Sequence, residues 1–356
     1  MNKITFPRVG YDGVTYTQKA IENWYVGELL KKGIREDVKN LVNTKFELIT
    51  EEDREILRYL RDNEIEYILL CPLDEIDKER NCLLKLTPPK EQQRTTQKKE
   101  QEKSPNNTAF RKAIADAFKY DNYRQNVLVE LAKMLNVKVC PYCNMHYTLY
   151  ADETYNSKGK DELAKFQFDH FVNKNDYPMF SMSLYNLIPS CSVCNQGKYK
   201  KELPLALNPY YIESRNLFHF EVKKPLPLLM GKKEKDAIKI DVVCNDRKNS
   251  TDVTTYDKTF HISTLYSRHK DVVQEIFDKT YIASSARDIA KMLMRNKKNL
   301  SKEEHFAKEA IDKIEGYGGR YLSELWYGTY LSEKDIEKRP LTKFIQDIKK
   351  QSESIF

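Results

Sequence analysis

Two closely spaced pairs of cysteines restrict what this chain can fold into more than any other feature of the sequence. Cys140 and Cys143 form the first pair, and Cys191 and Cys194 form the second. Two thiolates separated by two residues can bind one metal ion from a single turn, and two such pairs complete a tetrahedral zinc site. A closed four-cysteine site has no open position for water, so its role would be structural. The alternative is four unpaired cysteines without a metal.

Composition indicates a helix-rich protein. A chain of 356 residues is too long for one small core, so we expect about two or three domains. The formal net charge of +7 suits a nucleic-acid partner without requiring one. No apolar run approaches the roughly 20 residues of a membrane span, and the N-terminal residues lack the apolar segment of a signal peptide. We therefore expect no membrane association and a cytoplasmic location, where paired cysteines bind metal more often than they form disulfides.

The spacing of apolar residues predicts a mainly α fold with a small α+β core. We expect a helical N-terminal domain over 1–86, a polar linker or mobile loop over 87–107 and a helical lead-in over 108–136. The cysteine pairs then fall in a module over 137–215, and a mainly helical C-terminal region covers 216–356. The helical regions would flank the metal-binding module on both sides.

Shorter patterns predict individual elements. Alternating or apolar runs favour strands at 65–70, 137–139, 166–168 and 218–222, and the residues 196–201 favour a short helix. The three remaining cysteines have no metal-ligand spacing and are expected to be ordinary buried or half-buried thiols; they are Cys71, Cys82 and Cys244.

A candidate catalytic set lies between the cysteine pairs and directly after the second one. His170 suits a general base, because the unperturbed pKa of histidine is near neutral pH. Asp169 and Asn195 offer the hard oxygen ligands that Mg²⁺ prefers. Asn186 could hold the imidazole of His170 or the adjoining backbone. A base and a divalent cation are what phosphodiester hydrolysis requires, so the set predicts metal-dependent cleavage of nucleic acid with Mg²⁺ or Mn²⁺.

The positions of Asp169 and His170 raise a geometric condition. Neighbouring residues on a regular strand point to opposite faces of the sheet. Both side chains can therefore serve one site only if the strand ends, twists or bulges at this point.

The motifs and their order resemble those of the zinc-stabilised HNH endonucleases. The sequence has Cys-Pro-Tyr-Cys at 140–143, Asp-His at 169–170, Asn-Leu-Ile-Pro-Ser-Cys at 186–191 and Cys-Asn at 194–195. The resemblance extends over 139–201, which is less than a fifth of the chain. It implies a β-hairpin followed by a helix around one catalytic metal, the ββα-metal motif, with a Cys₄ zinc site.

The same resemblance implies a role for each motif residue. His170 would be the general base, Asp169 and Asn195 the ligands of the catalytic Mg²⁺, and Asn186 the middle asparagine of the motif. The four cysteines would be the ligands of the structural zinc. Asn195 stands where the family also uses histidine, a variation that leaves the choice among Mg²⁺, Mn²⁺ and Ni²⁺ open.

Three lysines follow the second cysteine pair. Lys198, Lys200 and Lys201 could bind phosphate groups as point charges, and the alternative is a solvated basic helix face. His146 lies three residues after Cys143 and could be a spare zinc ligand, but four cysteines already complete the site. We therefore expect a surface or packing role for His146.

Two classes of function follow from these features. The first is an HNH endonuclease acting on DNA, with double-stranded DNA as the expected substrate. A broader similarity to Septu-type nuclease subunits implies a role in bacterial antiviral defence with an ATPase partner, and a homo-oligomer is compatible with it. The alternative is a non-catalytic, zinc-ribbon-like DNA-binding or scaffolding subunit. The residues do not separate DNA from RNA, or nicking from double-strand cleavage.

Overall fold

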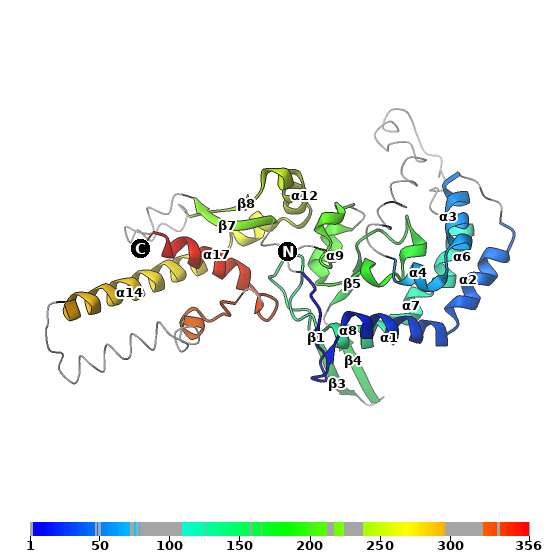
Figure 1. Ribbon diagram of the computed structural model, residues 1–356, viewed down its shortest axis with the longest axis horizontal. Helices are drawn as coiled ribbons and strands as arrows, with labels where there is room; N and C mark the ends of the chain where they lie inside the picture. The colour runs from blue at the N-terminus through cyan, green and yellow to red at the C-terminus, as the bar shows by residue number, and fades with distance from the viewer. Residues whose placement is uncertain are drawn as a thin grey trace. The chain divides into compact units, whose positions relative to one another are not determined.

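A computed structural model shows the fold of the chain (Figure 1). It describes residues 3–46, 48, 51–71, 75, 78, 109–124, 126–156, 159–164, 166–199, 201–211, 217–223, 238–295, 323–332 and 335–355. The linker expected at 87–107, Cys82 and Lys200 lie outside these described residues.

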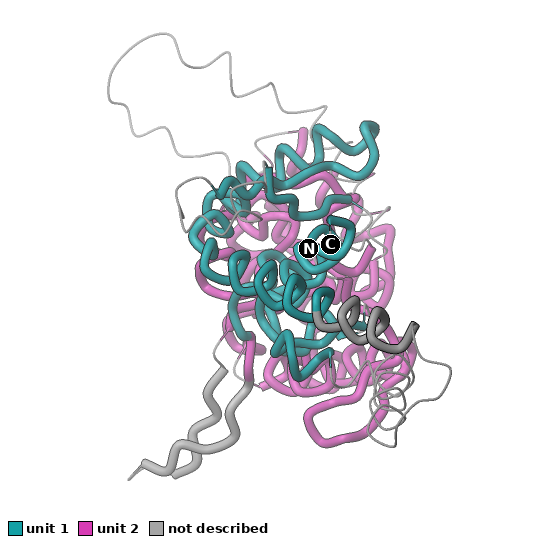
Figure 2. Tube along the Cα trace, turned by 90° about the vertical axis from the view of Figure 1, so that its left-hand side faces the viewer, with its two compact units in different colours: residues 1–2, 138–147, 212–356 teal, residues 3–137, 148–211 magenta. Residues whose placement is uncertain are grey.

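Two compact units make up the chain, and each is assembled from segments that are distant in sequence (Figure 2). Unit 1 comprises Met1–Asn2, Lys138–Tyr147 and Ile212–Phe356. Unit 2 comprises Lys3–Val137 and Thr148–Tyr211. The division into five consecutive ranges stays a prediction.

Unit 2 is mainly helical, and its helices bury one apolar face each. Its helices are α1 (Gln18–Lys31), α2 (Ile34–Asn43), α3 (Glu51–Asp62), α4 (Ile65–Leu69), α6 (Ala109–Phe118), α7 (Tyr120–Tyr123), α8 (Val127–Leu135) and α9 (Ser192–Lys198). The start of α1 is capped by Thr17, whose hydroxyl accepts a hydrogen bond from the Ala20 amide at 3.2 Å. Leu29, Ile114 and Leu131 are among the fully buried core residues. The helical spacing seen in these segments is therefore confirmed.

The strand predicted at 65–70 is wrong, because these residues form the helix α4. Ile65, Ile68 and Leu69 are buried and lie at the i, i+3 and i+4 positions of one helix face. A short apolar run satisfies a buried strand and a buried helical turn equally well, so its pattern alone cannot separate them.

A β-hairpin followed directly by a helix carries most of the candidate residues. In this hairpin, β5 (Gln167–His170) pairs antiparallel with β6 (Leu187–Ser190), and His170 lies opposite Leu187. One residue separates the end of β6 from the start of α9, and α9 packs on β5. The strand predicted at 166–168 is confirmed as part of β5. The helix predicted at 196–201 exists, but it begins earlier, at Ser192, and ends at Lys198.

Two further hairpins belong to unit 2. They are β1 (Arg8–Val9) with β2 (Thr15–Tyr16), and β3 (Tyr150–Asn156) with β4 (Gly159–Ala164). Three short 3₁₀ turns, Pro178–Phe180, Leu184–Asn186 and Leu205–Leu207, complete the described elements of this unit.

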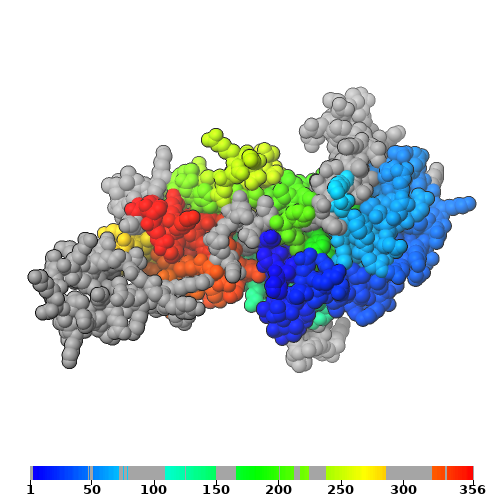
Figure 3. All heavy atoms as spheres, in the orientation of Figure 1, coloured from blue at the N-terminus to red at the C-terminus, as the bar shows by residue number. Residues whose placement is uncertain are grey.

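Unit 1 combines one hairpin with helices. Its elements are β7 (Phe218–Lys223), β8 (Lys239–Cys244), a 3₁₀ turn (Arg247–Asn249), α12 (Ser250–Phe260), α13 (Ile262–Tyr266), α14 (Lys270–Arg295) and α17 (Thr342–Glu353). The ring of Phe220 packs on Tyr266 at 4.2 Å and on Phe344 at 5.2 Å between centroids. In the space-filling view α17 lies against the segment 323–332, where Gln346 donates to the carbonyl of Tyr330 at 2.9 Å (Figure 3).

The two strand predictions in this part of the chain have different outcomes. The strand at 218–222 is confirmed as β7. The strand at 137–139 is wrong, because Val139 makes a single isolated bridge with Tyr147.

Among the helices that the structure describes, none combines the length and apolar character needed to cross a membrane.

Candidate functional site

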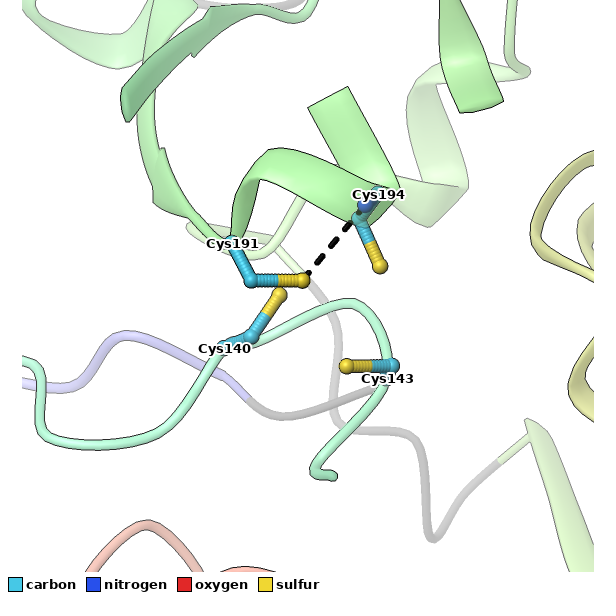
Figure 4. Close-up of side chains that lie close together, drawn as sticks. All are labelled: Cys140, Cys143, Cys191 and Cys194. Carbon is cyan, nitrogen blue, oxygen red and sulfur yellow. Dashed lines mark hydrogen bonds between the residues drawn. The ribbon is translucent and has the colours of Figure 1, made fainter. Parts of the chain in front are cut away.

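Four buried cysteines converge on one small volume (Figure 4). Their Sγ atoms all lie within 4.8 Å of one another, and all four cysteines are free of disulfides. Zinc bonds of about 2.3 Å in a tetrahedron would place the sulfurs about 3.8 Å apart, so little movement is needed to bind an ion. The four soft donors fit zinc. The predicted clustering is confirmed, and the cluster could hold a structural metal such as zinc.

Local hydrogen bonds shape both halves of the cluster before any metal binds. The Cys143 Sγ accepts the amide of Met145 at 3.4 Å, and the Cys191 Sγ accepts the amide of Cys194 at 3.4 Å. The second bond caps the first turn of α9. Amide donors of this kind favour the thiolate form that metals bind.

The loop that carries the first cysteine pair is tied to its surroundings by buried groups. Asn144 has a left-handed backbone with φ of 50°, and its side-chain oxygen accepts the Lys343 amide at 3.1 Å. The hydroxyl of Tyr266 donates to the Cys143 carbonyl at 2.6 Å. His146 places Nδ1 3.6 Å from the Cys143 Sγ, beside the four-sulfur set.

The interface between β5 and α9 holds two polar pairs in register. The Asn195 amide donates to the Gln167 side-chain oxygen at 2.5 Å. Three residues further along α9, the Lys198 ammonium contacts both carboxylate oxygens of Asp169 at 3.2 Å. Because residues two apart on a strand and three apart on a helix share a face, Asp169 and Asn195 lie on the same interface. The structure thus places both candidate metal ligands at the interface between β5 and α9.

Lys198 is part of this interface and not of the surface. Its side chain is 1% exposed, and the ammonium also donates to the His170 carbonyl at 2.7 Å. Both roles predicted for Lys198 are therefore wrong. The residue neither lies on a solvated helix face nor points outward to bind phosphate. Lys201 is exposed, as a surface phosphate contact requires.

His170 is half-buried and contacts groups other than α9. Its Nε2 lies 3.0 Å from the carbonyl oxygen of Ser181, so Nε2 carries the hydrogen and Nδ1 is left as the acceptor. The ring of Tyr120 lies edge-on at 4.5 Å between centroids. Burial, together with the charges of Lys174 and Lys198, lowers the pKa of His170 to about 3 against the raising effect of the Ser181 carbonyl. The imidazole is therefore neutral at neutral pH.

The side chains of Asp169 and His170 contact different elements, as the alternation of a strand requires. Asp169 faces α9, whereas His170 faces Ser181 and Tyr120. His170 is the last residue of β5, so the regular strand ends at the position where the sequence required an end, twist or bulge. Tyr120 is near both groups, since the Asp169 charge is among the causes that raise its pKa.

Asn186 holds backbone and not the imidazole. It is fully buried, its side-chain oxygen accepts the Val172 amide at 2.7 Å, and its amide donates to the carbonyls of Val172 at 3.1 Å and Phe180 at 2.9 Å. Its own carbonyl accepts the Phe171 amide at 2.9 Å. Of the two roles that the sequence left open, the structure shows the contact with the adjoining backbone.

Two residues near His170 have no motif signal in the sequence. Tyr120 comes from α7, and burial raises its pKa to about 12. Lys174 lies four residues after His170 and places its ammonium 4.1 Å from the centre of the Tyr120 ring. Lys174 could have been noted for its closeness to the Asp-His pair, whereas only the fold brings Tyr120 to this site.

Comparison with known proteins finds no match for the chain among family models, curated proteins or solved structures.

Proposed function

We propose that the chain is a metal-dependent HNH endonuclease that hydrolyses phosphodiester bonds of DNA. The observation that carries the proposal is the unit β5–β6–α9, a hairpin followed by a helix. Asp169 and His170 end the first strand, Asn186 immediately precedes the second, and Asn195 lies on the helix. The residue types and their order are those of the motif that the sequence resembles.

The donor set on β5 and α9 fits a hard divalent cation. Asp169 offers a carboxylate, and the Asn195 amide nitrogen is engaged with Gln167, which leaves its oxygen for a metal. A Mg²⁺ or Mn²⁺ ion bound there would neutralise charge on the phosphate and on the departing oxygen. Lys198 orients the Asp169 carboxylate from within the interface.

His170 is arranged to accept a proton from water. Its Nε2 hydrogen is held by Ser181, so the Nδ1 lone pair is the acceptor. A pKa near 3 makes the free imidazole a weak base. A bound phosphate would offset the nearby lysine charges and raise that pKa toward the range useful for catalysis. Asn186 keeps the loop after His170 in place by its three side-chain hydrogen bonds.

The wider role that we propose rests on the resemblance to Septu-type nuclease subunits. The chain would act on double-stranded DNA in the cytoplasm, with structural zinc in the cysteine cluster and an ATPase as partner in antiviral defence. The helices of both units are far larger than a hairpin and one helix need for cleavage, which leaves surfaces for DNA, for the partner or for a second copy of the chain.

One observation favours a second candidate function. The Asp169 carboxylate is buried and already bonded to Lys198, so a metal would have to share it with an ammonium. A non-catalytic, zinc-stabilised DNA-binding or scaffolding subunit would have no need of that metal, and the ion pair would then simply join β5 to α9.

Cleavage of supercoiled plasmid separates the two candidates. Purified wild type, His170→Ala and His219→Ala would be incubated with Mg²⁺ or Mn²⁺, and the zinc content of each would be measured. His219 is a half-buried histidine on β7 and serves as the matched control. The nuclease predicts conversion of plasmid by wild type and His219→Ala only, with about one zinc in every protein.

A different pattern would contradict the nuclease. If His170→Ala converted plasmid as well as wild type does, His170 would have no role in the reaction. Zinc-loaded wild type that cuts nothing, either alone or with a candidate ATPase partner and ATP, would leave the non-catalytic subunit as the function. Equal cleavage with and without that partner would contradict the proposed regulation by an ATPase.

A further inference from the structure

The loop that follows β5 carries a lysine next to His170. The Lys174 ammonium lies 4.1 Å from the centre of the Tyr120 ring, and the same ring contacts His170 at 4.5 Å between centroids. Tyr120 therefore supports both the imidazole and the ammonium. A cation held against an aromatic ring keeps its charge while losing part of its freedom.

This loop is fixed on both sides of Lys174 by buried side chains. On one side, Asn186 bonds both the amide and the carbonyl of Val172. On the other, the Arg111 guanidinium donates to the Asp176 carbonyl at 3.0 Å, and Arg111 is itself paired with Asp53 at 2.9 Å. Lys174 thus projects from a short segment whose two ends are anchored in the core. Such anchoring is what a preorganised ligand contact needs.

The charge of Lys174 is only weakly balanced within the fold. Among the described residues, its nearest carboxylate is that of Asp121 at 4.0 Å, and the Asp121 side chain is 87% exposed, so solvent screens the pair. Burial lowers the pKa of Lys174. A second ammonium group, that of Lys198, lies 2.7 Å from the His170 carbonyl oxygen. An anion bound beside the imidazole would relieve this accumulation of positive charge.

We propose that Lys174 binds the DNA phosphate next to His170, with Tyr120 holding its ammonium in position. This inference deepens the proposed function and rests on it for the identity of the anion. The side chain is 36% exposed, which lets the ammonium reach a ligand while its stem stays packed. The compact charge of a lysine suits a single phosphate oxygen.

DNA binding in a cleavage-deficient background tests the inference. Lys174→Met and Lys174→Arg would be made in full-length His170→Ala protein, and the Kd for a fluorescein-labelled duplex would be measured by anisotropy over a range of salt concentrations. Lys338→Met is the matched control, because Lys338 also lies over a tyrosine ring, Tyr330 at 5.0 Å, and pairs with Asp335. Thermal unfolding would establish that each variant is folded.

We expect Lys174→Met to weaken binding about tenfold and to reduce the slope of log K against log salt by about 1. Lys174→Arg should retain most of the affinity, and Lys338→Met all of it. Unchanged binding by folded Lys174→Met, an equal loss in Lys338→Met, or no measurable binding by the parent at low salt would overturn the inference.

The outcomes separate this inference from the nuclease itself. If wild type cuts plasmid and Lys174→Met binds and cuts normally, the nuclease stands and the role of Lys174 falls. If wild type never cuts but Lys174→Met loses binding, the phosphate contact stands in a non-catalytic DNA-binding protein.

Discussion

The cysteine cluster and the surroundings of His170 are built on opposite principles. In the cluster, four identical donors converge, each buried, with sulfurs within 4.8 Å of one another. Around His170, the neighbours differ in kind: a carbonyl at Nε2, an aromatic ring, and two cations that disfavour its protonated form. A metal could complete the first region, whereas an anion is what we propose for the second.

The difference suggests separate roles for the two regions, which we propose to be stability and reactivity. A closed metal site contributes folding free energy and needs no access to solvent. The pKa of the His170 imidazole is lowered by burial and by nearby cations, and strongly shifted pKa values are typical of functional sites. We therefore propose a structural role for the cysteines and a chemical role for His170, and each variant below tests one side of this comparison.

The largest effect is expected from the cysteines. In Cys191→Ser, one of four ligands is lost, and the buried thiols that remain cannot hold the ion in a closed site. Apparent zinc-binding energies in small zinc domains are about 10–16 kcal/mol, so loss of most of this term should unfold the segment around α9. Zinc analysis and thermal unfolding would show metal loss together with a large drop in Tm.

Cys244→Ser provides the control for that variant. Cys244 is a half-exposed free cysteine outside the cluster. The Cys244→Ser variant should therefore have the zinc content and the Tm of wild type. If Cys191→Ser lost its zinc and kept the Tm of wild type, the cluster would not be the structural region, and the comparison would fail on its first side.

The second effect concerns the ion pair beneath His170. Lys198→Met leaves the buried Asp169 carboxylate without its ammonium, which should cost about 3–5 kcal/mol in the free energy of unfolding. Adding Asp169→Asn should recover part of this loss, because removal of both charges is far less costly than removal of one. Urea unfolding of the two single variants and the double variant would give the coupling energy.

A matched variant separates stability from function here. Lys343 is equally buried, with 1% of its side chain exposed, and pairs with Asp347 at 2.8 Å. Lys343→Met should lose comparable stability, yet only Lys198→Met should also change cleavage at temperatures where both proteins are folded. Equal effects on cleavage would show that Lys198 acts through stability alone.

Spacing made the cysteine cluster and the hairpin predictable from sequence. The spacing of a Cys-x-x-Cys pair indicates a metal-ligand geometry within four residues of sequence. The alternation of Phe166 and Phe168 likewise indicated β5. The apolar residues at 65–70 misled because α4 buries Ile65, Ile68 and Leu69 with a spacing that a six-residue window cannot distinguish from a strand.

The surroundings of His170 could not be predicted in the same way. Tyr120 is fifty residues away in sequence and reaches His170 only through the fold. Lys198 was expected on a surface because lysines are almost never fully buried unless paired, and the pairing with Asp169 is visible only when α9 packs on β5. Local patterns thus indicated the candidate ligands, and long-range packing determines their electrostatic surroundings.

A third, smaller effect is a dependence of stability on pH that His170 causes. In the unfolded chain this histidine binds a proton near pH 6.5, whereas in the folded protein it does so only at about pH 3. The stability from the neutral imidazole is therefore fully present above pH 6.5 and is lost as the pH falls from 6.5 toward 3. Between pH 7 and 5 the loss should be about 2 kcal/mol or somewhat less.

Urea unfolding of wild type and His170→Asn at pH 7 and pH 5 measures this term. Wild type should lose more stability on acidification than His170→Asn, because the titration of other groups is common to both. A parallel series with His219→Asn tests whether any histidine gives the same difference. Identical pH dependence of wild type and His170→Asn would contradict the claim that the surroundings of His170 disfavour its protonated form.

The smallest effect is expected from Lys201, which lies beyond the end of α9 and is exposed. Lys201→Ala removes a solvated charge, so its unfolding free energy should stay within about 0.5 kcal/mol of wild type. In the His170→Ala background, duplex affinity should fall by less than for Lys174→Met. Within the described part of the chain, no aromatic ring supports the Lys201 ammonium as Tyr120 supports that of Lys174. Anisotropy titrations at matched salt would rank the two lysines. A larger loss for Lys201→Ala would mean that the main phosphate contact is the exposed lysine after α9 and not Lys174 in the loop beside His170. The contrast between the two regions would then no longer indicate where DNA binds.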